Sequence, residues 1–295
     1  MMQKSAGRNS PYVQVSQTPL PAPMPAPVPA PAPIHQPTDV LASILPAAAH
    51  ETEVQSRVAA LFKQIHRHVD TYYRDVHASI TPSMEPELIR FGVKDVNMAE
   101  LLQDCSNPTT ALKHALMAYV LDITGPKKGD EGETLFPDEL DSARALDAST
   151  GELSKIVTSH LPPRNTIIDP TLATASTLHR RLSVLLYTSN FNSTTSPRRS
   201  WSFQSDMREA AEHFSLTFFP WANPGSDDQE KEDDLTRIIS EVLETRVWLF
   251  GQPSEFEFRW DSVGSRGVVV SPELVKQDEA GGERRVVLES GVSGL

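Results

Sequence analysis

Apolar side chains recur with a helical period through most of the chain after residue 50. The stripe is clearest over 51–77, where it comprises Val54, Val58, Leu61, Phe62, Ile65, Val69, Tyr72 and Val76. A heptad register would place His68 and Asp75 in the seam, so the pattern favours a globular helix over a coiled coil. Thr81-Pro82 should end this segment, because the residue before a proline avoids the helical conformation.

A second helix, over 108–123, is expected at the centre of the fold because nearly every side of it is apolar. Asn107-Pro108 supplies an N-cap residue and a proline for the first helical position. Gly125-Pro126 supplies the stop.

Three helices are expected in the following part of the chain. Two short ones cover 137–148 and 151–160. A longer one begins after Asp169-Pro170 and reaches about Thr188. Its apolar face comprises Leu172, Ala175, Leu178, Leu182, Leu185 and Leu186.

Two long helices are expected after residue 202. The first ends at Pro220. Its apolar face comprises Met207, Ala210, Ala211, Phe214 and Phe218. The second begins with a capping box between Ser226 and Gln229 and reaches about Phe250.

The last 40 residues allow two interpretations. Segments 268–270 and 285–289 are rich in valine and could form a hairpin around a turn at 278–282. Alternatively, 271–273 starts a short helix. The expected fold is therefore mainly α: an irregular bundle of about seven or eight helices, with a small C-terminal β-hairpin as the open alternative.

The first 50 residues have a different composition from the rest. Every second residue over 19–33 is proline, and no charged side chain lies between Arg8 and Asp39. Such a run favours extended polyproline II and cannot build a core. We expect two parts: a disordered Pro/Ala-rich leader, 1–50, and a single helical domain, 51–295. The leader could be a spacer or a ligand for an SH3-type domain.

The charge is concentrated in the body. The chain has a net charge of −12, and the leader holds Lys4 and Arg8 against Asp39, or +1, which leaves −13 for the body. An acidic surface repels nucleic-acid phosphates and anionic lipids, so neither is an expected partner. No 18-residue apolar stretch exists, so a soluble protein without a membrane span is expected. A single cysteine, Cys105, fits a cytoplasmic location.

Four polar residues of the first helix could lie near one another. The steps His66–Asp70 and Tyr73–His77 are i,i+4 spacings, which could chelate zinc or iron. A di-iron bundle also needs Glu-x-x-His pairs on other helices, and none occurs. We therefore predict no metal site and no cofactor, and interpret these residues as a solvated flank of the helix.

Other chemistry-bearing residues also fit structural roles. Arg246 projects from the middle of an apolar stripe, so it should pair with a carboxylate, reach water or bind an anion. His179 borders its helix's apolar face and fits a core histidine. Cys105 has no neighbouring cation or base that would make it a nucleophile. Residues 125–129 lack the strand and the final Lys-Ser/Thr of a phosphate loop, so no catalytic or cofactor-binding residue is predicted.

The polar segment 189–202 is expected to be a loop. Within it, Ser196-Pro197 resembles a proline-directed kinase site, and Ser200 and Ser202 follow arginines as in basophilic sites. Whether any of them is phosphorylated is left open.

Four segments together resemble a family of uncharacterised proteins from filamentous, ascomycete-type fungi. They are VAALFKQIHRHVDTYYRDVHASITPSMEPEL (58–88), LLQDCSNPTTALKHALMAYVL (101–121), GDEGETLFPDEL (129–140) and LFGQPSEFEFRW (249–260). The resemblance covers most of the body but not the leader. It implies a helical domain with no established activity, and no catalytic residue is carried over. Some members of that family carry a membrane-spanning segment before the domain, and we expect none in this chain.

Many core positions and no catalytic pattern favour a non-enzymatic module that binds another protein, so an enzyme is the less favoured class. The rival is an enzyme or a small-ligand-binding bundle whose site assembles across helices, around Arg246 or His66 and His77. A third hypothesis is an adaptor whose leader docks a polyproline reader. The test that separates the first two is whether His66, Asp70, His77 and Arg246 line one cavity.

Overall fold

The computed structural model divides by internal contacts into Met1–Ser43 and Ile44–Leu295. It describes residues 44–93, 96–127, 134–141, 170–189, 201–260, 267–277 and 284–294. The proline run, the helix expected over 151–160, most of the one expected over 137–148, and Ser196 and Ser200 lie outside these residues.

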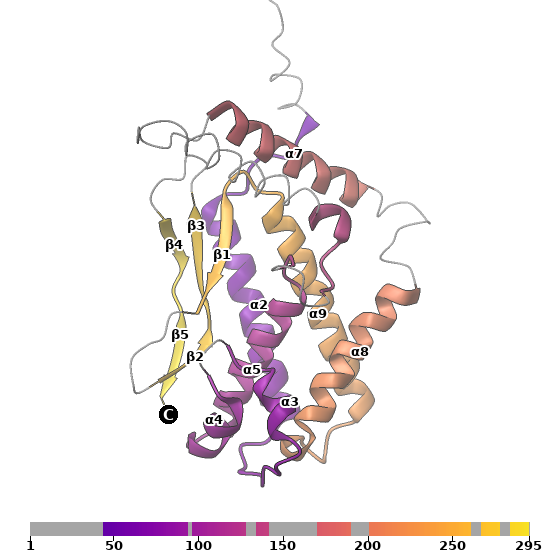
Figure 1. The fold of residues 1–295 in the computed structure, drawn as a ribbon, viewed down its shortest axis with the longest axis vertical. Helices are drawn as coiled ribbons and strands as arrows, with labels where there is room; N and C mark the ends of the chain where they lie inside the picture. The colour runs from indigo at the N-terminus through magenta and orange to yellow at the C-terminus, as the bar shows by residue number, and fades with distance from the viewer. Residues whose placement is uncertain are drawn as a thin grey trace, which may run out of the picture. The chain divides into compact units, whose positions relative to one another are not determined.

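Helices make up most of the second unit, and strands follow at its C-terminus (Figure 1). The helices are α2 (Glu51–Tyr72), α3 (Glu85–Ile89), α4 (Met98–Asp104), α5 (Pro108–Ile123), α7 (Pro170–Ser189), α8 (Trp201–Thr217), the 3-10 helix η3 (Phe219–Trp221) and α9 (Asp228–Phe250). The strands are β1 (Glu255–Arg259), β2 (Gly267–Ser271), β3 (Glu273–Gln277), β4 (Arg284–Leu288) and β5 (Gly291–Gly294). The mainly α fold with a small C-terminal β element is confirmed. None of the described helices is long and apolar enough to cross a bilayer.

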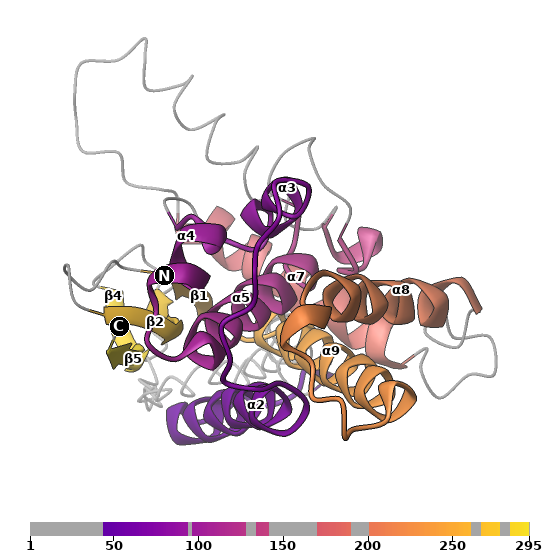
Figure 2. The same cartoon turned by 90° about the horizontal axis from the view of Figure 1, so that it is seen from below.

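Helix α5 is the central element, as its sequence predicts. It packs against α2, α4, α9 and β2, and Figure 2 shows it surrounded by these elements. Its bounds match the prediction, because the proline at its start and the Gly-Pro pair at its end act locally. Asn107 makes no side-chain cap; instead the backbone N–H of Thr109 donates to Asp75 Oδ1 at 3.1 Å.

Helix α2 ends five residues before the predicted position. At that point the chain joins the segment that follows α8: Tyr73 forms an antiparallel bridge with Ala222. The Arg74 N–H also donates to the Trp221 carbonyl at 2.8 Å. These long-range bonds replace the next helical turn. The apolar stripe is buried through Tyr72, but Val76 is 37% exposed, so its predicted place in the stripe is wrong.

Helix α7 begins where predicted but presents a different face. Among the side chains of α7 that the structure describes, from residue 174 onward, the buried ones are Arg180 and Val184, whereas Leu186 is 59% exposed. His179 is exposed, so the expectation of a core histidine is wrong. The helix packs on α9, and the hydrogen bonds of Arg180 described below fix which side turns inward.

Two helix starts differ slightly from the predictions. The N-cap of α9 is Asp227, whose carboxylate accepts from the Gln229 N–H, so the capping box predicted between Ser226 and Gln229 is wrong and the helix begins one residue later. Helix α8 already includes Trp201 and Ser202, which the sequence placed in a loop.

The strands form two small antiparallel groups, ordered β1-β3-β4 and β2-β5. Strands β3 and β4 flank the predicted turn, so a hairpin at that place is confirmed, and the alternative helix from 271–273 is wrong. The valine-rich β2 pairs with β5 rather than with β4, and β1 was not predicted. A register shift between Val269 and Ser271 leaves Val270 as an extra residue in β2.

Candidate functional site

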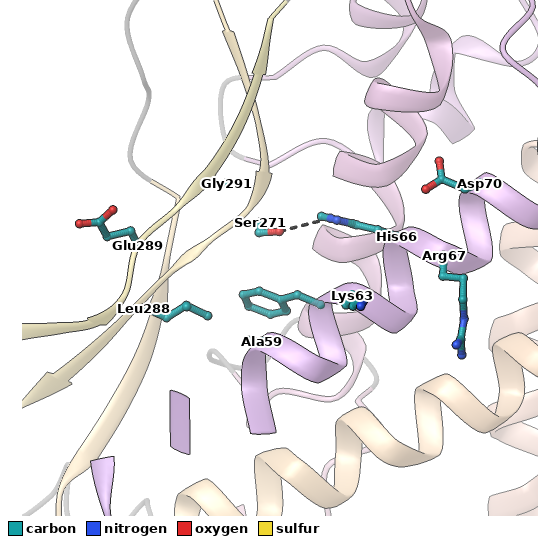
Figure 3. A pocket seen from close by; sticks show the side chains of 10 residues that line it. Ala59, Lys63, His66, Arg67, Asp70, Ser271, Leu288, Glu289 and Gly291 are labelled. Carbon is teal, nitrogen blue, oxygen red and sulfur yellow. Dashed lines mark hydrogen bonds between the residues drawn. The ribbon is translucent and has the colours of Figure 1, made fainter. Parts of the chain in front are cut away.

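An open groove of about 450 Å³ runs along α2, opposite strands β2, β4 and β5 (Figure 3). Helix α2 contributes residues three or four positions apart, which therefore share one side of the helix. The lining consists of Ala59, Phe62, Lys63, His66, Arg67 and Asp70 from α2, of Ser271, Leu288 and Gly291 from the strands, and of Glu289 from the link between β4 and β5.

His66 reaches across the groove to β2. Its Nε2 lies 3.1 Å from the Val270 carbonyl oxygen and 3.2 Å from Ser271 Oγ. A carbonyl oxygen only accepts hydrogen bonds, so Nε2 carries the hydrogen and donates it to Val270. In this tautomer Nε2 has no lone pair with which to take a proton from Ser271. The pair therefore does not form the nucleophile and base of a serine hydrolase.

His114 of α5 binds the neighbouring residue of the same strand. Its Nδ1 lies 2.6 Å from the Val269 carbonyl oxygen and donates to it. Two histidines from two helices thus hold consecutive carbonyls of β2 beside the register shift. Burial lowers the pKa of both histidines, while these backbone hydrogen bonds raise it by less. Both rings are therefore neutral near pH 7.

The metal-chelating set that the sequence allowed is not assembled. Asp70 pairs with Lys113 at 2.6 Å. Tyr73 lies beyond the end of α2 and is buried, and His77 is exposed and outside any helix, so the Tyr73–His77 step does not exist. Within the residues that the structure describes, no three His, Cys, Asp or Glu side chains could hold a metal ion.

A buried His–Asp pair joins α2 to α9, and sequence reasoning did not assign it a role. His68 is 1% exposed, and its Nδ1 lies 2.8 Å from Asp234 Oδ2. Burial lowers the pKa of His68, and the hydrogen bond to Asp234 raises it by less. The hydrogen bond from His68, with Arg237 assisting, lowers the pKa of Asp234 to about 2. A neutral imidazole therefore donates to a carboxylate. The sequence held one signal for this pair: a heptad register would place His68, a polar residue, in the apolar seam.

A larger cleft of about 850 Å³ lies between the C-terminal ends of α5 and α9 and strand β1. Its described lining includes Arg90, Arg180, Arg246 and Arg259. The carboxylates in the same lining are those of Asp122, Glu255 and Glu257.

Arg246, singled out by its place in the apolar stripe, is half-buried in this cleft. Its Nη2 donates to the Leu121 carbonyl oxygen at 3.3 Å. Its guanidinium carbon lies 4.8 Å from the ring centroid of Phe258, a cation–π distance. These contacts agree with the expectation of a structurally paired arginine, and its position in the cleft keeps the anion-binding alternative open.

Arg180 was not predicted as a site residue. Its Nη1 donates to Glu255 Oε1 at 3.0 Å, and its Nη2 donates to the carbonyls of Gln252 and Pro253, both at 3.0 Å. It is 5% exposed, so this guanidinium fixes the turn between α9 and β1. Nothing local in the sequence marked it, because these three hydrogen-bond acceptors lie 72 to 75 positions away.

The four residues chosen from the sequence do not share a cavity. His66 and Asp70 line the α2 groove, Arg246 lines the larger cleft beside β1, and His77 lines neither. Cys105 is buried, and its thiol donates to the Asn107 carbonyl at 3.3 Å.

In comparisons with known proteins, no family model matches the chain, and no curated protein or solved structure is similar to it. The resemblance to a fungal family therefore stays a prediction.

Proposed function

We propose that this protein is a non-enzymatic interaction module that binds an extended segment of a partner protein in the α2 groove. The observation that carries the proposal is the charge arrangement around this open groove. Its helix side presents Lys63 and Arg67, and its strand side presents Glu289. Within the described part of the chain, none of these three side chains makes an ion pair.

The spacing of the two cations fits an extended occupant. Lys63 and Arg67 are one helical step of four residues apart, a rise of about 6 Å along α2. Alternate side chains on one face of an extended strand are about 6.6 Å apart. A partner segment with acidic residues at positions i and i+2 could therefore meet both cations, while a basic residue on the other side faces Glu289.

The apolar part of the groove supports the same occupant. Phe62 and Leu288 line it between the charged rims. Burial of apolar side chains supplies affinity, and charges at a rim supply selectivity and association rate. The hydrogen bond from His66 to Val270 holds the two walls together, which lowers the ordering cost of binding.

The expected setting of this function follows from composition. We propose a cytosolic protein of the fungal family named above, which binds protein rather than nucleic acid. The net charge of −12 supports a partner other than nucleic acid, and the single cysteine fits a cytosolic location.

Panning a phage-displayed peptide library on the full chain tests the proposal, followed by fluorescence anisotropy with the selected peptides. We expect enrichment of acid-x-acid peptides. The double variant Lys63→Glu/Arg67→Glu should weaken their binding by at least about tenfold. Arg208→Glu is the matched control, because Arg208 is an exposed arginine on α8. Equal binding to wild type and to the double variant, or no enrichment of acidic peptides, would contradict the proposal.

A further inference from the structure

His66 lies between the two cations that an occupant of the α2 groove is proposed to meet. Along α2 it follows Lys63 by three residues, a rise of about 4.5 Å, and it directly precedes Arg67. Figure 3 shows its ring reaching across the groove towards Ser271. Residues three or four positions apart share one side of a helix, so an extended segment that contacts both cations passes this ring.

The nitrogen of His66 that the fold leaves open is Nδ1. Nε2 carries the hydrogen that is donated to the Val270 carbonyl oxygen at 3.1 Å, so Nδ1 carries the lone pair. Within the described part of the chain, Nδ1 has no hydrogen-bond partner. His68 and His114 each hold an unpaired ring nitrogen that is buried, whereas the unpaired nitrogen of His66 is not buried. His66 lines the groove, so Nδ1 is accessible to an occupant.

A lone pair on Nδ1 and a carboxylate are compatible only with a proton between them. Both are hydrogen-bond acceptors, so a neutral His66 offers an acidic side chain no donor. A protonated imidazole donates from both nitrogens, and its positive charge strengthens the hydrogen bond to a carboxylate. The bond to Val270 suits both states, because Nε2 carries a hydrogen in each. Protonation therefore adds a contact for the occupant and keeps the one that joins the walls.

The charged groups around His66 keep it neutral until an occupant brings a carboxylate. Burial lowers the pKa of His66; the Val270 hydrogen bond and Asp70 oppose this, and Lys113 assists it. Asp70 is itself paired with Lys113 at 2.6 Å. The other titratable groups that line the groove or bind beside Val270 are Lys63, Arg67, Glu289 and His114. A carboxylate of the occupant within about 4–6 Å would raise this pKa, because it favours the charged imidazole.

From the place of His66 between the cations and from its open Nδ1, we infer that an acidic residue of the occupant binds His66 together with a proton taken from the solvent. Nδ1–H then donates to the carboxylate, and no group of the protein gives up a proton. His66 thereby selects an acidic side chain over an amide. The inference rests on the proposed function and names a third contact in the same groove. Since binding takes up a proton, the affinity rises as the pH falls.

Fluorescence anisotropy of the full chain with a rhodamine-labelled peptide, Thr-Glu-Val-Glu-Val-Lys, tests the inference. We expect the affinity at pH 5.5 to be at least about threefold higher than at pH 7.5. The peptide's glutamates titrate at about pH 4.3 and stay ionised in this range. Calorimetry in two buffers of different ionisation enthalpy should show uptake of about half a proton per complex at pH 6.5. The peptide with glutamine at both glutamate positions should bind weakly and without proton uptake.

The variant His66→Gln keeps a side-chain N–H but cannot take up a proton, so the pH dependence of its affinity should be flat. His179→Gln is the matched control, because His179 is exposed on α7, and it should behave as wild type. Circular dichroism at each pH checks that the variants are folded. If His66→Gln is unfolded, nitrogen NMR of the wild-type ring takes its place. At pH 6.5 it should show a hydrogen on Nε2 alone without peptide, and on both nitrogens with peptide.

The outcomes separate this inference from the proposed function. Equal affinity at both pH values, binding without proton uptake, an unchanged pH dependence in a folded His66→Gln variant, or a ring that stays neutral in the complex would overturn the inference alone. If the peptide does not bind at any pH, the proposed function fails, and the inference fails with it.

Discussion

Gly125 leaves the space that the guanidinium of Arg246 occupies. A Cβ at position 125 would lie 2.5 Å from Arg246 Nη2 and 3.1 Å from the Leu121 carbonyl oxygen, which is the acceptor of Arg246. The glycine that ends α5 therefore also lets α9 place a charged side chain against the end of that helix.

Gly125→Ala should displace Arg246 without changing any charge. The guanidinium can move, but the carbonyl beside it cannot move without disturbing α5, so we expect the free energy of unfolding to fall by about 1–2 kcal/mol. Urea denaturation measures this change. Gly225→Ala is the matched control, because a Cβ there meets only the Asn223 side chain at 3.5 Å. Equal stability of the two variants would contradict the crowding at position 125.

Arg180 and Glu255 should contribute unequally although they form one ion pair. The Arg180 side chain is 6% exposed and also binds two carbonyls, whereas the Glu255 side chain is 61% exposed. Arg180→Met leaves those carbonyls without a donor, and we expect a loss of about 3 kcal/mol. Glu255→Gln removes only a partly solvated charge and should cost less than about 1 kcal/mol. Chemical denaturation of both variants checks the difference, and similar losses would show that the ion pair, not the turn, is what matters.

Local signals in the sequence predicted the local features of this fold. The bounds of α5 follow from a proline and a glycine within the segment itself. The end of α2 does not, because it depends on a bridge between Tyr73 and Ala222, which are distant in sequence. The buried face of α7 was also missed, since Arg180 turns inward to carbonyls that its own helix does not contain.

The residues of the candidate sites also divide into those with a local signal in the sequence and those that depend on distant parts of the chain. A polar residue within an apolar stripe is a signal that the sequence shows directly. Arg246 stood out for this reason, and His68 stood out because a heptad register would place it in the seam. The partners of His66 and His114 could not be predicted, because both histidines bind backbone carbonyls of β2, and backbone groups carry no sequence signal. The valine-rich sequence of β2 marks it as a strand but does not specify its partner, so β2 was assigned to the wrong strand.

The two histidines that hold β2 should make stability depend on pH. In the unfolded chain they titrate near pH 6.5, and burial lowers the pKa of each in the folded protein. Above pH 6.5 neither state binds these protons. Below it the unfolded state binds them first, so the free energy of unfolding falls until the pH passes the lowered folded-state pKa. For His66, Lys113 assists the lowering and Asp70 opposes it.

Urea denaturation between pH 8 and pH 5 measures this slope. The double variant His66→Gln/His114→Gln should flatten it in part, and the remainder should come from His68, whose pKa burial also lowers. His179→Gln is the matched control, because His179 is exposed. An unchanged slope in the double variant would show that the two rings are not held neutral by the fold.

The His68–Asp234 pair should also make the free energy of unfolding depend on pH, but at lower pH and through the carboxylate of Asp234. In the folded protein the pKa of Asp234 lies at about 2, compared with 3.8 for a free aspartate. Its contribution of about 2 kcal/mol is complete above pH 4 and is lost as the pH falls from 4 to 2. In Asp234→Asn the stability should already be lower at pH 7, and this acid-dependent loss should be missing. Asp233→Asn is the control, because Asp233 is its exposed neighbour on α9. The free energy of unfolding is measured by denaturation at each pH. If it falls equally in wild type and in Asp234→Asn between pH 4 and pH 2, the carboxylate is not stabilised by His68, and another contact must join α2 to α9 at this point.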